Sequence, residues 1–260
     1  MNFFALKSYF NFILKSSNAH GVHSPFVYDL VTKCFYDKTK FEGYKQLKSY
    51  RSTLLKSKDS ITVEDFGAGS TVFKSNTRKV SDLAKIAGAS KSESQLLFRI
   101  IRYFNPKSFL ELGTSLAIST YTTNCASPHT KVTTVEGSKS IFDWNKKFTA
   151  KYNFKNTDFV NSLFDDYLKN LSEDKTFDLI YIDGNHTYEA TKNYFEILKK
   201  HIHKDSLIIF DDIHWSEEMD RAWNEIIADR DVTLSIDTFH FGMVFFRTEQ
   251  YNKEHFVVRS

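Results

Sequence analysis

The sequence predicts an α/β protein built on an open, mostly parallel sheet that ends in an antiparallel hairpin. From about residue 90 onward, short apolar segments alternate with longer segments whose apolar residues recur at helical spacing. Two of the short segments, 177–182 and 207–210, are almost continuously apolar. Such segments are typical of strands that helices cover on both faces of a doubly wound sheet.

The first expected element is an amphipathic helix within residues 1–17. Its apolar stripe consists of Phe3, Leu6, Phe10, Ile13 and Leu14. Polar residues interrupt this run, so we do not expect a secretory signal peptide. We expect the stripe to dock on the body of the protein or on a partner subunit of a homodimer. A membrane-surface helix is the weaker alternative, because the polar face carries only two cations.

The rhythm of strands and helices extends to the end of the chain. Expected strands are 108–112, 132–135, 158–160, 177–182 and 207–210, and expected helices are 92–104, 117–126, 138–152, 164–171, 188–201 and 217–228. Segments 232–239 and 243–247 are separated by only a few residues around Gly242, which predicts the hairpin. We therefore expect a sheet domain at 91–260 and a mainly helical extension at 1–90 that makes substrate-side or oligomer contacts.

Composition excludes several classes of protein. The 260 residues are 41% hydrophobic and 26% charged, as in an ordinary globular chain. A net charge of +3 is too small to indicate a nucleic-acid binder. The two cysteines, Cys34 and Cys125, exclude a disulfide scaffold and favour a reducing, cytoplasmic compartment. No apolar run approaches the ~20 residues that span a bilayer, so we expect no membrane span.

In an open parallel sheet, ligands bind beyond the carboxyl ends of the strands. The first predicted strand is followed by Gly113, where the backbone of a tight turn can approach a ligand closely. The second is followed by Glu136, an acid placed to accept hydrogen bonds from a ribose diol. Ser115 and Ala117 interrupt the full glycine pattern of dinucleotide sites. We therefore expect a nucleoside-sized cofactor rather than NAD.

Three runs together resemble class I S-adenosylmethionine-dependent methyltransferases: 111–115, 135–137 and 181–186. The runs 183–188 and 210–213 are similar to the O-methyltransferase subgroup of macrolide-sugar methyltransferases and cephalosporin hydroxylase-like proteins. The resemblance covers about residues 92–247. It implies a Rossmann-like, seven-stranded sheet whose last strand is antiparallel, and S-adenosylmethionine as cofactor. The family's last glycine of the first motif is Ala117 here.

The resemblance also implies which residues bind the cofactor. The expected set is Glu111, Gly113, Thr114, Ser115, Glu136, Gly137, Ser162, Leu163 and Asp183. Within it, Glu111 and Gly113 would line the methionine end of the cofactor. Glu136 would hold the ribose hydroxyls, and Ser162 with Leu163 would flank the adenine.

Three carboxylates are expected to converge at the catalytic end of the sheet. Asp183 follows the fourth predicted strand, and Asp211 with Asp212 follows the fifth. Neighbouring strands lie about 4.8 Å apart, so these charges would repel one another unless a cation offsets them. Oxygen ligands suit Mg²⁺, Mn²⁺ or Ca²⁺, and such a metal would lower the pKa of the acceptor's hydroxyls. The alternative is that the aspartates only cap the helices that follow, in a metal-free site.

His186 is the expected general base, with Asp183 as its catalytic partner. It stands three residues after Asp183, so one turn brings both side chains to the same mouth. The alternative is a histidine that only bonds a neighbouring carboxylate. His214, close to Asp212, is a second candidate base.

Two further motifs resemble sites. The run 65–70 contains two glycines and resembles a cofactor loop, but the polar residues after it form no apolar helical face. We interpret it as a tight turn, with a substrate-side loop as the alternative. His20 and His23 could bind a metal, but no carboxylate is near them in sequence.

The sequence as a whole predicts an S-adenosylmethionine-dependent methyltransferase that methylates a hydroxyl of a small molecule, with divalent metal assistance as an option. Two other functions stay open. One is a non-catalytic binding protein on the same fold, which the joint presence of Glu136, Asp183 and His186 disfavours. The other is a methyltransferase for RNA or protein, which the small net charge disfavours.

Overall fold

The computed structural model describes residues 3–64, 76–86, 89–249 and 252–260. The chain forms two compact units. One contains residues 38–169, and the other contains residues 1–37 together with 170–260.

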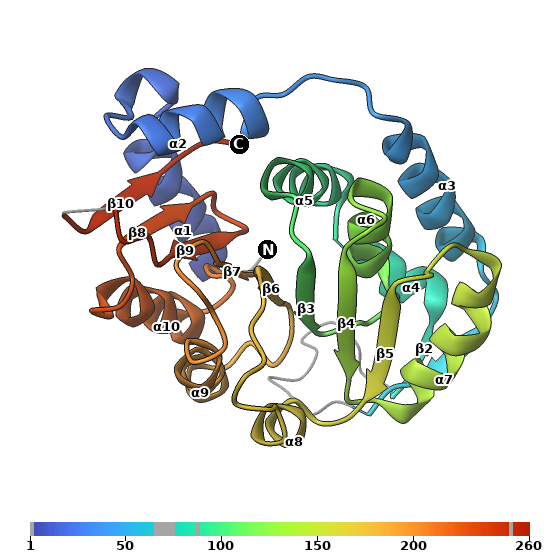
Figure 1. Ribbon diagram of the computed structural model, residues 1–260. Coiled ribbons are helices and arrows are strands. Elements are labelled where there is room, and N and C mark those ends of the chain that lie inside the picture. The colour runs from blue at the N-terminus through green and yellow to red at the C-terminus, as the bar shows by residue number, and fades with distance from the viewer. Residues whose placement is uncertain (1–2, 65–75, 87–88, 250–251) are drawn as a thin grey trace. The chain divides into compact units, whose positions relative to one another are not determined.

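The unit of residues 38–169 is built on three parallel strands, with β4 between β3 and β5 (Figure 1). The strands are β3 (Ser108–Leu112), β4 (Lys131–Glu136) and β5 (Thr157–Asn161), and the helices are α3 (Glu42–Lys56), α4 (Val80–Ile86), α5 (Lys91–Phe104), α6 (Ile118–Ala126), α7 (Lys139–Phe148) and α8 (Phe164–Lys169). A small antiparallel pair, β1 (Ser60–Thr62) with β2 (Thr77–Lys79), completes it. Leu112 lies opposite Val135, and Val135 lies opposite Val160, so the loops after the three strands leave the same edge.

Local sequence signals explain the boundaries of α5. Ser90 and Glu93 form a reciprocal capping box at its start. Asn105 ends the helix in the left-handed conformation, at φ 48°, directly before Pro106. The predicted helix 92–104 is confirmed, and it buries Leu96, Leu97, Ile100 and Ile101.

The second unit contains strands in the order β10-β8-β9-β7-β6. Its strands are β6 (Leu179–Ile182), β7 (Leu207–Phe210), β8 (Leu234–Asp237), β9 (Gly242–Phe245) and β10 (Glu254–Val257), and its helices are α1 (Phe3–Lys15), α2 (Pro25–Leu30), α9 (Tyr188–Leu198) and α10 (Glu217–Ala228). β6 and β7 are parallel, whereas β9 is antiparallel to both β7 and β8. Every residue of β6 and β7 is buried, as their continuous apolar runs predicted.

The mostly parallel α/β architecture, its closing antiparallel hairpin and its N-terminal helices are confirmed. One element was not expected: β10 pairs in parallel with β8, and it is a strand beyond the seven that the family resemblance implied. The helix expected within residues 1–17 is present as α1. α1 buries Ala5 and Phe12, whose ring packs on Phe239, while Phe3 and Leu14 of the expected apolar stripe are exposed.

Within the described residues, no helix is both long enough and apolar enough to cross a membrane.

Candidate functional site

The loop after β3 has a strained backbone. Gly113, Ser115 and Ala117 all have positive φ, at 110°, 45° and 55°. For residues with a side chain, the left-handed conformation costs about 1–2 kcal/mol each. Gly113 N donates to Val135 O at 3.0 Å, which fixes the start of the loop against β4. Contacts around the loop must therefore offset the strain at Ser115 and Ala117.

Glu136 ties this loop to the one that follows β4. Its Oε2 accepts a hydrogen bond from Ser115 N at 2.9 Å, and its Oε1 accepts one from Ser138 N at 2.8 Å. Burial raises the pKa of Glu136, these N–H groups oppose that effect, and the pKa is about 7. The carboxylate therefore lies where the two loops meet, and its charge changes near neutral pH.

Glu111 belongs to β3 and lies just before the loop 113–117. It is fully buried, and its Oε2 accepts hydrogen bonds from the hydroxyls of Thr120 and Thr134. The hydroxyl of Thr114 bonds to Thr134 at 2.6 Å. Burial raises the pKa of Glu111, against the effect of its hydroxyl donors. Its Oε1 is buried and has no hydrogen-bond partner among the described residues.

The loop after β5 also meets Glu136. Ser162 N and Asn161 Nδ2 both donate to the main-chain oxygen of Glu136, at 3.1 and 2.8 Å. Leu163 beside them is 41% exposed. The structure thus brings together, at one edge of β3, β4 and β5, the predicted cofactor residues of this unit.

Asn145 on α7 is a residue of this edge that the sequence analysis missed. It is fully buried, its Nδ2 donates to Ser115 O at 2.6 Å, and its Oδ1 has no donor among the described residues. A buried asparagine on an otherwise amphipathic helix is the signal that could have found it. The buried oxygens of Glu111 and Asn145 that lack a donor, together with the carboxylate of Glu136, suit a ligand rich in donors, such as an ammonium group and ribose hydroxyls. The residues at this edge therefore fit S-adenosylmethionine.

The predicted catalytic acids belong to the other unit. Ile182 pairs with Phe210, so Asp183 and Asp211 leave the same edge of the parallel strands β6 and β7. Asp212 has φ 52°, in the left-handed region. The backbone thus places Asp183 and Asp211 at the ends of neighbouring strands.

His186 lies close to Asp183, with 3.7 Å between its Nε2 and Asp183 Oδ1. The two side chains are 24% and 25% exposed, so both can be reached from outside. Burial lowers the pKa of His186, and the charge of Asp212 opposes this effect. The histidine is thus a neutral imidazole near pH 7, and the Asp183 carboxylate beside it can stabilise the imidazolium form.

No three His, Cys, Asp or Glu side chains in the described parts of the chain are grouped so that they could hold a metal ion. Among the described residues, no such group contains Asp183, Asp211 or Asp212, or the exposed His20 and His23. The glycine run 65–70 lies outside the described residues.

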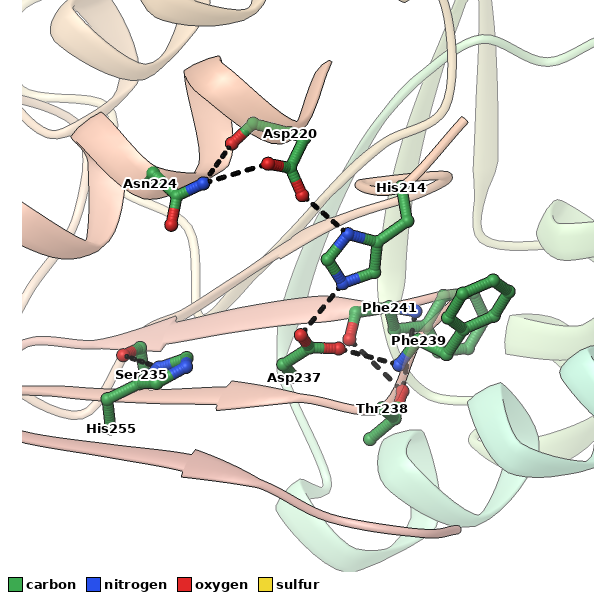
Figure 2. A network of polar contacts seen from close by, with 9 residues as sticks. All are labelled: His214, Asp220, Asn224, Ser235, Asp237, Thr238, Phe239, Phe241 and His255. Atoms are coloured by element: carbon green, nitrogen blue, oxygen red, sulfur yellow. Dashed lines mark hydrogen bonds and ion pairs between the residues drawn. The ribbon is translucent and has the colours of Figure 1, made fainter. Parts of the chain in front are cut away.

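The structure corrects the interpretation of His214 as a second candidate base. Figure 2 shows its ring between two carboxylates: Nδ1 lies 2.9 Å from Asp220 Oδ1, and Nε2 lies 2.8 Å from Asp237 Oδ2. Burial disfavours the charged ring, but the two hydrogen bonds outweigh it and raise the pKa of His214 to about 9. A ring that is already protonated, with both nitrogens engaged, accepts no proton at neutral pH.

Comparison with known proteins gives one family match, a methyltransferase domain, over residues 110–213. A curated relative, an uncharacterized protein of Acanthamoeba polyphaga mimivirus, is 38% identical over 55 residues, which are 20% of this chain and 25% of that protein. The chain thus matches only about a quarter of that relative's length.

Solved structures resemble the chain over a larger share. The S-adenosylhomocysteine-bound methyltransferase PaMTH1 of Podospora anserina shares 13% identity at a TM-score of 0.57, over 87% of this chain and 97% of its own. An O-methyltransferase of Bacillus cereus in complex with S-adenosylhomocysteine shares 17% identity at a TM-score of 0.54, over 81% of this chain and 94% of its own.

The O-methyltransferase TomG of Streptomyces achromogenes, in complex with S-adenosylmethionine, shares 16% identity at a TM-score of 0.52, over 61% of this chain and 81% of its own. At these identities the likeness shows the fold, which is the Rossmann-like methyltransferase fold. The family match adds that residues 110–213 resemble a methyltransferase domain.

Proposed function

We propose that the protein transfers the methyl group of S-adenosylmethionine to a hydroxyl of a small molecule. The observation that carries the cofactor assignment is the edge of β3 and β4, where oxygens of Glu111 and Asn145 are buried without a donor and the Glu136 carboxylate joins two loops. The O-methyltransferases among the similar structures support oxygen as the methylated atom.

The residues of this edge have distinct expected roles. Glu111, with Gly113, Thr114 and Ser115, would bind the methionine end of the cofactor. Glu136 and Gly137 would bind the ribose, whose hydroxyls donate to carboxylate oxygen. Ser162 and Leu163 would flank the adenine, for which the exposed Leu163 side chain offers an apolar surface. Asp183 stays a cofactor residue predicted from the family resemblance.

Bound S-adenosylmethionine supplies an electrophilic methyl group, so a C–O bond forms as the C–S bond breaks and S-adenosylhomocysteine leaves. The acceptor hydroxyl must lose its proton during this step. His186 takes that proton on its neutral imidazole, and Asp183, 3.7 Å away, stabilises the imidazolium that results. A positioned base of this kind contributes about 10²–10⁴-fold in rate.

A divalent cation at Asp183, Asp211 and Asp212 stays a prediction. These side chains do not form a three-ligand group in the described structure, so no step of the reaction is derived through a cation. The proposed reaction needs only the base and the alignment of the two reactants, which is itself a large contribution to the rate of such transfers.

The acceptor and the assembly are proposals of the same kind. A small-molecule acceptor agrees with the net charge of +3, which gives nucleic acid little to bind. Residues 1–90 are proposed to make acceptor-side or subunit contacts. A homodimer through α1 is one such contact, because Phe3, Phe10 and Leu14 expose 85%, 61% and 83% of their surface.

The experiment is a turnover assay that detects S-adenosylhomocysteine with a panel of catechols, other phenols and sugar hydroxyls as acceptors. We expect one hydroxylated class to be turned over, and we expect His186→Ala to reduce turnover by about 10²–10⁴-fold while S-adenosylhomocysteine still binds. His203→Ala is the matched control, because His203 also pairs with an aspartate, Asp178, at 2.9 Å. Equal turnover by both variants would remove His186 from the mechanism.

A further inference from the structure

The loop 113–117 is held by one contact that the predicted cofactor set does not include. The hydroxyl of Tyr50 donates to Leu116 O at 2.9 Å, and both residues are buried. Tyr50 belongs to α3, 66 positions before Leu116 and within the N-terminal extension, for which the sequence predicted only substrate-side or oligomer contacts. This contact connects that extension to the loop of the proposed cofactor site.

α3 is seated closely enough to hold Tyr50 in place. Its buried residues Gly43, Leu47, Tyr50 and Leu54 recur at helical spacing and form one face. A Cβ on Gly43 would lie only 2.4 Å from the ring of Phe98, so glycine permits the close approach of α3 to α5. The helix therefore presents Tyr50 from a fixed position.

Packing also fixes the ring of Tyr50. It stacks on Tyr121 with a centroid separation of 4.4 Å and meets the edges of Phe148 and Tyr152 at 5.5 and 4.7 Å. Burial raises the pKa of Tyr50 well above its ordinary value, so the hydroxyl keeps its proton and remains a donor. Because the Tyr50 side chain has little freedom, its hydrogen bond restricts the position of the Leu116 carbonyl.

The neighbouring carbonyl of the loop is held in the same way from another helix. Asn145 Nδ2 donates to Ser115 O, so successive carbonyls, those of Ser115 and Leu116, each accept from a buried side chain. These are the carbonyls between the left-handed residues Ser115 and Ala117. The two donors therefore help to offset the strain of the left-handed backbone at Ser115 and Ala117.

We propose that Tyr50 and Asn145 are positioning residues that keep the loop 113–117 in its cofactor-binding conformation before the cofactor arrives. The inference rests on the proposed function in one respect, which is that this loop binds S-adenosylmethionine. A protein whose loop is ordered in advance binds its ligand with the full intrinsic affinity. If the loop is ordered only part of the time, the apparent affinity equals the intrinsic affinity multiplied by the fraction of time that the loop is ordered.

The test uses Tyr50→Phe, which keeps the ring and its stacking but removes the donor. Tyr152→Phe is the matched control, because it removes a hydroxyl from the same aromatic cluster and leaves the Tyr50–Leu116 hydrogen bond intact. Asn145→Leu is the second variant, since it keeps the side-chain volume and removes the donor to Ser115 O.

Two measurements separate this inference from the proposed function. The first is hydrogen–deuterium exchange of the segment 113–118 in the ligand-free proteins, read by mass spectrometry. We expect exchange to be at least several-fold faster in Tyr50→Phe and Asn145→Leu than in wild type or Tyr152→Phe. Unchanged exchange in both variants would overturn the inference whether or not the protein binds S-adenosylhomocysteine.

The second measurement is the affinity for S-adenosylhomocysteine by calorimetry, together with the melting temperature of each ligand-free protein. Leaving one buried carbonyl without its donor is expected to weaken binding about tenfold in Tyr50→Phe and to leave Tyr152→Phe within twofold of wild type. A purely structural role would instead lower the melting temperature and leave the affinity of the folded protein unchanged, which would contradict the inference. Absence of binding in wild type would overturn the proposed function. The exchange measurement would still test whether Tyr50 orders the loop 113–117.

Discussion

Glu136 makes the affinity for S-adenosylhomocysteine depend on pH. Its carboxylate has a pKa of about 7 in the ligand-free protein, because burial outweighs the N–H groups of Ser138 and Ser115. A ribose diol donates hydrogen bonds to the ionised form, so binding favours loss of the proton. The ionised fraction is about one eleventh at pH 6 and about ten elevenths at pH 8. The affinity should therefore rise about tenfold between these two pH values.

The assay is calorimetric titration at several pH values, each in two buffers that differ in ionisation enthalpy. At pH 6 the binding of one ligand should release close to one proton, and at pH 8 close to none. Glu136→Gln should bind more weakly and lose the pH dependence. Its new amide group also faces the donors Ser115 N and Ser138 N.

Asp143→Asn is the matched control, because Asp143 is an exposed carboxylate paired with Lys139 in the same unit. It should leave both the affinity and its pH dependence unchanged. An affinity that stays flat from pH 6 to pH 8, with no proton released, would refute the reasoning about Glu136.

Three further outcomes are expected. The pKa of His214 is raised from 6.5 to about 9, so the stability that its two carboxylate partners provide is fully present below pH 6.5 and is lost as pH rises through 9. The melting temperature of wild type should therefore fall more between pH 7 and pH 10 than that of His214→Gln. Equal decreases in the two proteins would contradict this. Ala117→Gly should raise the free energy of unfolding by about 0.5–1 kcal/mol in urea titrations, because φ is 55° there, and a destabilised variant would show that the buried methyl group matters more. If a cation binds the strand-end aspartates, EDTA should abolish turnover and Mg²⁺ or Mn²⁺ should restore it. Asp211→Asn should then weaken metal binding more than it weakens S-adenosylhomocysteine binding. Full activity in EDTA would instead indicate a metal-free site with His186 as the base.

The sequence predicted those parts of the fold whose cause is local. β6 and β7 were evident because strands buried on both faces require continuous apolar runs. β10 was not, because Glu254–Val257 is short and only partly buried. The residues of α1 that pack within the chain were not evident for a related reason. Spacing shows that a helix has an apolar stripe, but not that Phe12 instead meets the ring of Phe239.

The candidate site shows the same division. Parallel strands place their carboxyl ends at one edge, so Glu111 and Glu136 could be assigned from their positions after predicted strands. Tyr50 and Asn145 could not, because each acts through one hydrogen bond to a main-chain carbonyl, and such a bond leaves no pattern of spacing. His214 was misjudged because its partner Asp237 stands 23 positions away, and that carboxylate helps to raise the pKa of the ring to about 9.

The most direct test of the central claim is calorimetric binding of S-adenosylhomocysteine to the wild-type chain, with NAD as the competing ligand and Glu136→Ala as the variant. We expect S-adenosylhomocysteine to bind more tightly than NAD, and we expect Glu136→Ala to lose about 1.5–3 kcal/mol of binding free energy, the usual loss for hydrogen bonds to a charged group. Tighter binding of NAD than of S-adenosylhomocysteine, or unchanged affinity in folded Glu136→Ala, would contradict the account.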